Sequence, residues 1–201
     1  EDEIKVGDEK VKFGVVIGNP PYQISDGGAQ ASAKPIYQHF VLLGKEIASD
    51  YSCFITPTRW FAGGKGLDEF RDLMLGDKTI KELHDFLTPE DVFPNTNNRG
   101  GVCYFINDMD KTDFEVKVIT HQNNTVIANS TRKLLLDGVD IFIRDSIAIE
   151  IINKIFTFSF EDNLSSIVSP RKPFGLESNI VKTAIFMSSD LGLKDPVICI
   201  G

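Results

Sequence analysis

The sequence lacks several features that mark whole classes of proteins. It has only three cysteines in 201 residues (Cys53, Cys103 and Cys199), and no two of them stand in a CxxC spacing. This odd, scattered set argues against a disulfide framework or a zinc site and fits a reducing cytoplasm. No apolar run approaches the roughly 18 residues of a membrane span, and the acidic first residues do not resemble a secretory signal. We therefore expect a cytoplasmic protein with no membrane partner.

Basic residues are also scarce. The sequence has 21 lysines and arginines and 29 aspartates and glutamates, which gives a net charge of −8. This composition lacks the excess of basic residues that is typical of proteins that bind nucleic acids. The carboxylates are scattered without metal-ligand spacing, so no metal site is predicted. The composition, with 42% hydrophobic and 25% charged residues, is that of a globular chain.

Short apolar runs alternate with helical patterns along the first 90 residues. Residues 13–18 are almost wholly apolar, which predicts a central parallel strand buried on both faces. Residues 36–48 predict an amphipathic helix, and 51–57 and 79–87 predict two more strands with a helix near 67–76 between them. The stripes expected on the helices are Ile36, Phe40, Leu43 and Ile47 in the first and Leu67, Phe70 and Met74 in the second.

The later part of the sequence predicts an antiparallel edge. Residues 102–106 predict a fourth apolar strand. In residues 114–120 apolar and charged side chains alternate, which is typical of an edge strand with one face in solvent. Residues 107–113 would be the hairpin loop between these two strands. A short strand is predicted near 139–143. A helix follows, with Ile147, Ile151 and Ile155 on one stripe and Asp145 or Ser146 as its cap. The predicted fold class is α/β, the second half of an open sheet with an antiparallel edge hairpin.

The sequence Asn19-Pro20-Pro21-Tyr22 directly follows the first predicted strand. Ligands of open α/β sheets bind beyond the carboxyl ends of the strands, so this turn lies where a site is expected. The prolines stiffen the backbone and offer no N–H, which leaves carbonyl acceptors in the turn. Asn19 adds a side-chain acceptor, and Tyr22 adds a flat ring. The alternative is a rigid structural turn without chemistry.

Such a site suits methylation of the exocyclic nitrogen of adenine. The lone pair of that nitrogen is delocalised into the purine, so the nitrogen is a poor nucleophile. Acceptors that hold its hydrogens favour a more tetrahedral nitrogen, whose lone pair can attack a sulfonium methyl group. The base has to leave the duplex, and an aromatic surface compensates part of the stacking that is lost.

Three ordered motifs carry a resemblance to a known family. Residues 16–23 (VIGNPPYQ) resemble the catalytic motif of the adenine-specific DNA methyltransferases of restriction–modification systems. Residues 54–60 resemble the next strand of that family, and 91–94 before an Asn-rich loop resemble its later motif. The resemblance covers roughly residues 13–120. It implies a Rossmann-like methyltransferase sheet, S-adenosylmethionine as cofactor, and double-stranded DNA with a flipped adenine as partner.

The resemblance also assigns roles to individual residues. Asn19, Pro20, Pro21 and Tyr22 are the predicted catalytic residues, and Asn19 is the main candidate for a contact with the cofactor. The Gly-rich stretch of residues 61–66 superficially resembles a cofactor loop, but a lone Gly-rich stretch is weak evidence. Phe93 is expected to pack on the adenine face opposite Tyr22, although it could equally fill the core. Contacts with DNA are considered for Asn95, Thr96 and Arg59, against a solvated loop for the first two and a surface ion pair for Arg59.

The resemblance is incomplete at the cofactor. The family binds S-adenosylmethionine through a Gly-rich turn upstream of the catalytic motif, and only 18 residues precede Asn19 here. We therefore expect this chain to be the C-terminal part of a longer enzyme, inactive alone and partnered by its missing N-terminal half. Residues 1–160 would belong to the catalytic domain, and 161–201 would begin a target-recognition region or linker. The alternative is a non-catalytic specificity or assembly module of a restriction–modification system.

Overall fold

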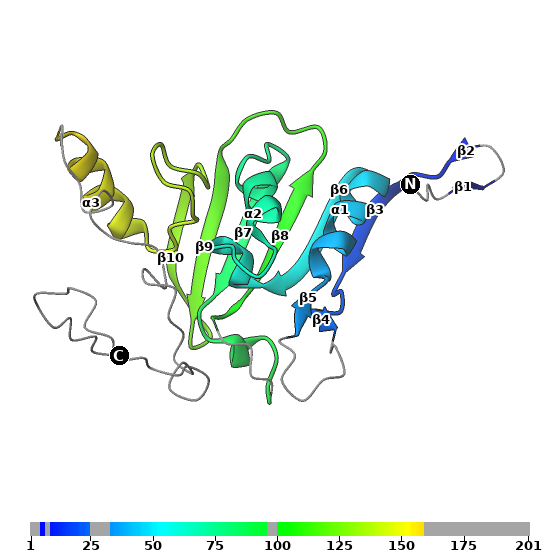
Figure 1. The fold of residues 1–201 in the computed structure, drawn as a ribbon, viewed down its shortest axis with the longest axis horizontal. Coiled ribbons are helices and arrows are strands. Elements are labelled where there is room, and N and C mark those ends of the chain that lie inside the picture. The colour runs from blue at the N-terminus through cyan, green and yellow to red at the C-terminus, as the bar shows by residue number, and fades with distance from the viewer. Residues whose placement is uncertain (1–4, 7–8, 25–32, 96–99, 159–201) are drawn as a thin grey trace, which may run out of the picture. The chain divides into compact units, whose positions relative to one another are not determined.

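The computed structural model describes residues 5–6, 9–24, 33–95 and 100–158 (Figure 1). The chain divides into two compact units, Glu1–Asn153 and Lys154–Gly201. The predicted boundary at residue 160 remains a prediction. The elements in chain order are β1 (Lys5–Val6), β2 (Glu9–Lys10), β3 (Phe13–Gly18), β4 (Gln23–Ile24), β5 (Lys34–Pro35), α1 (Tyr37–Ile47), β6 (Ala48–Pro57), the 3₁₀ turn η1 (Thr58–Phe61), α2 (Asp68–Leu75), β7 (Ile80–Phe86), the 3₁₀ turn η2 (Pro89–Asp91), β8 (Val102–Asp108), β9 (Val116–Gln122), β10 (Thr125–Arg132) and α3 (Ser146–Phe156).

Six strands form the main sheet, in the order β10-β9-β7-β8-β6-β3. β3 pairs with β6 in parallel and β7 pairs with β9 in parallel, whereas β8 is antiparallel to both of its neighbours. The strands β3, β6, β7 and β9 therefore run in the same direction, and their carboxyl ends share one edge of the sheet. Figure 1 shows this curved sheet with α1 and α2 in front of it. The predicted α/β class is confirmed. The sheet does end in an antiparallel hairpin, but this hairpin is β9–β10 and not the predicted one.

Both helices between the parallel strands cover the same face of the sheet. Tyr37 and Val41 of α1, together with Phe70 and Met74 of α2, belong to one buried cluster. The strands contribute Phe54, Leu83 and Phe105 to it. The predicted core stripe of α2 is confirmed, since Leu67, Phe70 and Met74 are all buried.

A pair of glycines lets α1 approach the sheet closely. A Cβ atom added at Gly44 of α1 would collide with the ring of Phe54 on β6, and one at Gly18 on β3 would lie 2.5 Å from the same ring. The Phe54 side chain thus fills the space between the helix and the last residue of β3. Because Asn19 follows Gly18, this contact also fixes the start of the candidate motif.

The structure corrects the prediction for residues 13–18 and the first helix. β3 forms, but among the described residues it is an edge strand rather than a central one, and Ile17 is 77% exposed. On α1 the buried side is Tyr37, Gln38, Val41 and Gly44. Phe40 and Leu43, which were expected to face the core, are 41% and 40% exposed.

The predicted hairpin between residues 102–106 and 114–120 is wrong. β7 lies between β8 and β9, so the connection through residues 109–115 crosses over a strand. Residues 139–143 form no strand, and β10 was not predicted. The signal for the true hairpin is the turn at Asn123 and Asn124, which both have positive φ, as a tight turn that matches strand twist requires.

The third helix forms as predicted, but its stripe stays exposed. The backbone N–H of Ile147 donates to Asp145 Oδ1 over 2.8 Å, which confirms the aspartate as the residue that satisfies the helix start. Ile147 and Ile151 are both more than half exposed. No helix within the described ranges has the length and apolar character needed to cross a membrane.

Candidate functional site

The candidate motif lies at the carboxyl end of β3, as the sequence predicts. Pro20 is buried, whereas Asn19 and Pro21 are exposed. No described residue hydrogen-bonds the side-chain amide of Asn19 or the carbonyl oxygens of the two prolines. The carbonyl of Tyr22 differs, because it accepts from the N–H of Ile36 over 3.3 Å. The acceptors that remain for a ligand are thus those of residues 19–21.

Tyr22 is half-buried against the core cluster rather than freely exposed. Its ring meets Tyr37 edge to face with centroids 6.4 Å apart, and it meets Phe93 in the same manner at 6.4 Å and 68°. The hydroxyl oxygen is buried and has no hydrogen-bond partner among the described residues. Burial raises the pKa of Tyr22 to about 12, so the phenol stays protonated at neutral pH. A buried hydroxyl without a partner costs free energy, which a polar group of a ligand would recover.

The structure brings Phe93 to Tyr22 across about 70 residues of sequence. Phe93 follows η2, and its backbone N–H donates to the carbonyl of Pro89 over 2.9 Å. The two rings are in edge contact, so the structure holds them together without a planar gap between them. Asn95 is exposed and has a positive φ of 69°, a conformation that asparagine tolerates better than most residues.

Arg59 lies exposed on η1, directly after β6, so it is at the same edge of the sheet as the motif. Its neighbours Thr58 and Trp60 are buried. Thr96 lies outside the described residues. The sequence-based site thus has Asn19, Tyr22, Arg59 and Phe93 at the carboxyl ends of β3, β6 and β7, while the roles assigned to these residues remain predictions.

An open groove of about 370 Å³ adjoins the motif and is lined by residues of β3 and α1 together with Phe54 of β6. One wall is the turn of Asn19, Pro20 and Pro21, and the other is the outer side of α1 with Phe40 and Leu43. The floor is formed by Val16 and Ile17 of β3. The groove is therefore apolar along its walls and ends at the acceptors of Asn19.

The Gly-rich loop after η1 is stabilised by its own helix. The N–H of Gly64 donates to Asp68 Oδ1 over 3.0 Å, and Arg71 donates to the carbonyl of Ala62 and to Asp68. The amide of Gly64 is therefore already hydrogen-bonded to Asp68, the first residue of α2. The loop therefore acts as a connection between β6 and α2, which agrees with the low weight that a lone Gly-rich stretch carries.

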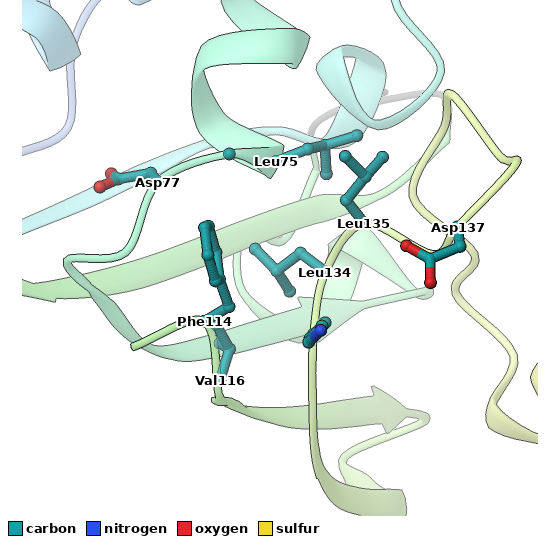
Figure 2. A pocket seen from close by; sticks show the side chains of 9 residues that line it. Leu75, Asp77, Phe114, Val116, Leu134, Leu135 and Asp137 are labelled. Carbon is teal, nitrogen blue, oxygen red and sulfur yellow. The ribbon is translucent and has the colours of Figure 1, made fainter. Parts of the chain in front are cut away.

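A second cavity lies at the opposite edge of the sheet, beside the amino ends of β7 and β9. It has a volume of about 160 Å³, and Figure 2 shows Leu75, Leu134, Leu135 and Phe114 around it. The carboxylate of Asp77 beside it already binds Lys45 and accepts from Asn107 over 3.0 Å. The exposed residues Lys133 and Asp137 also line this cavity. Within the described ranges, no three His, Cys, Asp or Glu side chains gather as metal ligands.

Sequence reasoning missed an ion pair at the site. Asp85 of β7 is fully buried, and Arg144 binds it through two hydrogen bonds of 2.7 and 2.5 Å. Burial raises the pKa of the Asp85 carboxyl, and the bonds from Arg144 oppose that shift. The sequence did not single out Asp85, because Lys81, Glu82 and His84 lie on the same strand. Its burial explains the ion pair, since a buried carboxylate requires a cationic partner.

The comparisons with known proteins agree with the motifs. Residues 1–93 match the model of the Eco57I restriction-modification methylase family. An uncharacterized adenine-specific methylase from Mycoplasma pneumoniae is 35% identical over 142 residues, which are 68% of this chain and 34% of that relative. The chain thus matches about a third of the length of this relative. Together these matches confirm the resemblance: the chain is related to the adenine-specific DNA methyltransferases of restriction–modification systems.

The comparison with solved structures finds partial likenesses. The methyltransferase subunit of a type I restriction-modification system from Streptococcus thermophilus is 20% identical, with a TM-score of 0.45 over 78% of this chain and 34% of that one. The type IIG restriction endonuclease BpuSI is 17% identical, with a TM-score of 0.40 over 53% of this chain and 15% of that one.

Proposed function

We propose that this chain carries the base-binding part of an enzyme that transfers a methyl group from S-adenosylmethionine to the exocyclic amino group of adenine in DNA. The observation that carries the proposal is the motif at the carboxyl end of β3. There the amide of Asn19 and the carbonyls of Pro20 and Pro21 have no described partner, beside the ring of Tyr22. The relation to restriction–modification methylases supports the same reaction.

The acceptors of the motif act on the amino group. Asn19 Oδ1 and a proline carbonyl accept its two hydrogens, which draws the nitrogen toward a tetrahedral geometry and frees its lone pair. Because these dipoles are fixed before the base arrives, they stabilise the positive charge that develops on nitrogen without rearranging. When bound, S-adenosylmethionine supplies an electrophilic methyl group on sulfur.

The aromatic residues hold the base outside the duplex. A base cannot lie between Tyr22 and Phe93 while their rings are in edge contact at 6.4 Å. We therefore assign to Phe93 a rotation away from Tyr22 when the adenine enters, so that the base stacks on one ring and packs against the other. The unpaired Tyr22 hydroxyl is a candidate partner for a polar edge of the base.

The described residues fit only one side of the cofactor. Asn19 and the groove beside it offer a polar end and apolar walls, whereas the Gly-rich loop of residues 61–66 is already bound by Asp68 and Arg71. The remaining contacts with the cofactor would come from the N-terminal half of the complete enzyme. The unpaired edge of β3 and the exposed apolar residues of α1 support docking of that half. A cytoplasmic location is part of this proposal.

The experiment measures methyl incorporation into duplex DNA by the complete protein and its Asn19→Ala variant. Removing one preorganised hydrogen-bonding group from an active site lowers kcat by about 100-fold or more, so incorporation should fall by at least that factor. Asn129→Ala, on the exposed side of β10, is the matched control and should retain wild-type incorporation. Full activity of the Asn19 variant would reject the proposal.

A second variant tests the stacking role. Tyr22→Ala should sharply reduce methyl transfer to a duplex substrate, whereas Tyr22→Phe keeps the ring, removes only the hydroxyl and should lose less. Unchanged rates with Tyr22→Ala would reject stacking. If the complete wild-type protein binds DNA but incorporates no methyl group into any base, the non-catalytic module is the better interpretation.

A further inference from the structure

Arg144 connects three separate parts of the candidate site. Its guanidinium donates Nε and Nη2 to the two oxygens of Asp85 on β7, over 2.7 and 2.5 Å. The third nitrogen, Nη1, donates to the carbonyl of Gly100 over 2.6 Å. The same group lies 5.5 Å from the ring centroid of Phe61 on η1. All three nitrogens are therefore engaged, and the charge is balanced by a buried carboxylate, so Arg144 is unsuited to binding a DNA phosphate directly.

The backbone that Arg144 holds is unusually restricted. Gly100 and Gly101 have φ values of +97° and +102°, which glycine adopts without strain. A Cβ atom at Gly101 would collide with the carbonyl of Phe86 and would lie 2.9 Å from Arg144 Nη2. From the other side, the hydroxyl of Thr58 donates to the Gly100 carbonyl over 2.7 Å, and the Thr58 N–H donates to the Gly101 carbonyl over 3.2 Å. The glycine pair is thus held between Arg144, Phe86 and Thr58.

A second group of hydrogen bonds fixes the backbone close to Phe93. It lies before Phe93 in the sequence, where the N–H of Asn124 donates to Asp91 Oδ2 over 2.8 Å. Thr88 adds a hydrogen bond to Asn123 in the same β9–β10 turn. In the sequence, Phe93 therefore follows residues that are bound to this turn and precedes the glycines that Arg144 and Thr58 bind.

We propose that Arg144 is a positioning residue for the adenine-binding site. It acts through Gly100 and Thr58: Arg144 fixes the Gly100 carbonyl, and the same carbonyl accepts from the hydroxyl of Thr58, the residue before Arg59 on η1. A small shift of either partner displaces the groups that receive the extruded base, and misplacement by about 1 Å costs on the order of 100-fold in rate. This inference rests on the proposed function and assigns to it a residue more than 40 positions beyond the matched motifs.

The test uses the complete protein and its Arg144→Lys variant, which keeps the positive charge but cannot bind Asp85 and Gly100 together. We expect kcat for methyl transfer to paired DNA to fall by about 10- to 100-fold, with KM for DNA changed less than threefold. On DNA with a mismatch at the target adenine, extrusion requires less energy, and the deficit should shrink by at least threefold. Arg71→Lys is the matched control, because Arg71 is also hydrogen-bonded to a carbonyl and carboxylates but lies on α2.

If Arg144→Lys does not fold, a milder variant, Thr58→Val, tests the same inference. Thr58→Val removes the hydroxyl bond to Gly100 and leaves the buried Asp85 paired, so it should lower kcat by about three- to tenfold, again with partial rescue on mismatched DNA. Wild-type kcat in folded Arg144→Lys, or an equal loss on paired and mismatched DNA, would overturn the inference. A wild-type protein that methylates no adenine would instead overturn the proposed function.

Discussion

β8 and β3 are both short apolar strands of one sheet, yet they have opposite surroundings. β8 lies between β6 and β7, and its Val102, Cys103 and Phe105 are fully buried. Within the part of the chain that the structure describes, β3 has β6 on one side only, and its Val15 and Ile17 are 57% and 77% exposed. An apolar run therefore shows that a strand is suited to burial, but its neighbours decide whether it is buried. We interpret the exposed side of β3 as a surface that the complete enzyme covers.

The two sides of α1 repeat this difference within one helix. Tyr37 and Val41 face the core, whereas Phe40 and Leu43 face the open groove beside β3. Both sides are apolar, so hydrophobicity alone does not distinguish them. The core side of α1 should therefore contribute more to the stability of this chain than the groove side.

The largest effect is expected where α1 meets the sheet. Phe54→Ala should lower the free energy of unfolding of this chain by about 3–5 kcal/mol, because the ring fills the space between Gly18 and Gly44. The control is Phe40→Ala on the exposed side of the same helix, with an expected loss below about 1 kcal/mol. Urea unfolding followed by circular dichroism measures both. Equal losses would show that the groove side is already packed in this chain.

A smaller loss is expected in the buried polar network at the amino end of the sheet. Asn107 is fully buried, donates to Asp77 and Thr79, and accepts from Ser52. Asn107→Ala should cost about 1–3 kcal/mol, since it leaves buried partners unsatisfied. Asn129→Ala should cost less than about 0.5 kcal/mol. A near-zero loss for Asn107→Ala in urea unfolding would contradict the importance of this network.

Substitutions on the exposed side should have little effect in this chain. Ile17→Thr and Leu43→Thr should each change its free energy of unfolding by no more than about 0.5 kcal/mol. In the complete enzyme the same substitutions should cost clearly more, because both side chains would then be buried. Thermal unfolding of both proteins makes the comparison. The same small effect in the complete enzyme would contradict docking at β3.

The smallest effect on stability is expected from a change of pH. It involves two histidines on the face of the sheet opposite α1 and α2. His84 Nδ1 and His121 Nε2 are 3.0 Å apart, and burial lowers the pKa of both imidazoles from the usual 6.5. The unfolded chain therefore binds more protons than the folded one just below pH 6.5. Stability should be fully present above that pH and should decline as the pH falls toward the lowered pKa values.

Thermal midpoints at pH 7.5 and 5.5 measure this decline. A double variant, His84→Gln with His121→Gln, should show a smaller difference between the two pH values. An unchanged difference would assign the decline to other groups.

The sequence predicted what depends on local pattern. The strands at residues 13–18, 51–57 and 79–87, the buried stripe of α2 and the place of Asn19 at a strand end follow from periodicity and proline chemistry, and all are present. The order of the strands did not follow, since β8 passes between β6 and β7 by long-range pairing that residue spacing does not encode.

The resemblance placed Phe93 opposite Tyr22, but two details of the site could not be predicted from the sequence. Arg144 and Asp85 are 59 residues apart, and neither stands in a motif. The edge contact between Tyr22 and Phe93 depends on how the connection after β7 folds back. Both features come from tertiary packing and required the structure.

The most direct test of the account is to identify the base that the complete enzyme modifies. Duplex DNA is incubated with the enzyme and S-adenosylmethionine labelled in its methyl group, digested to nucleosides, and separated by chromatography with mass detection. The account predicts label on the exocyclic nitrogen of adenine, and its loss in Asn19→Ala. Label on a cytosine carbon, or undiminished adenine methylation by Asn19→Ala, would contradict it.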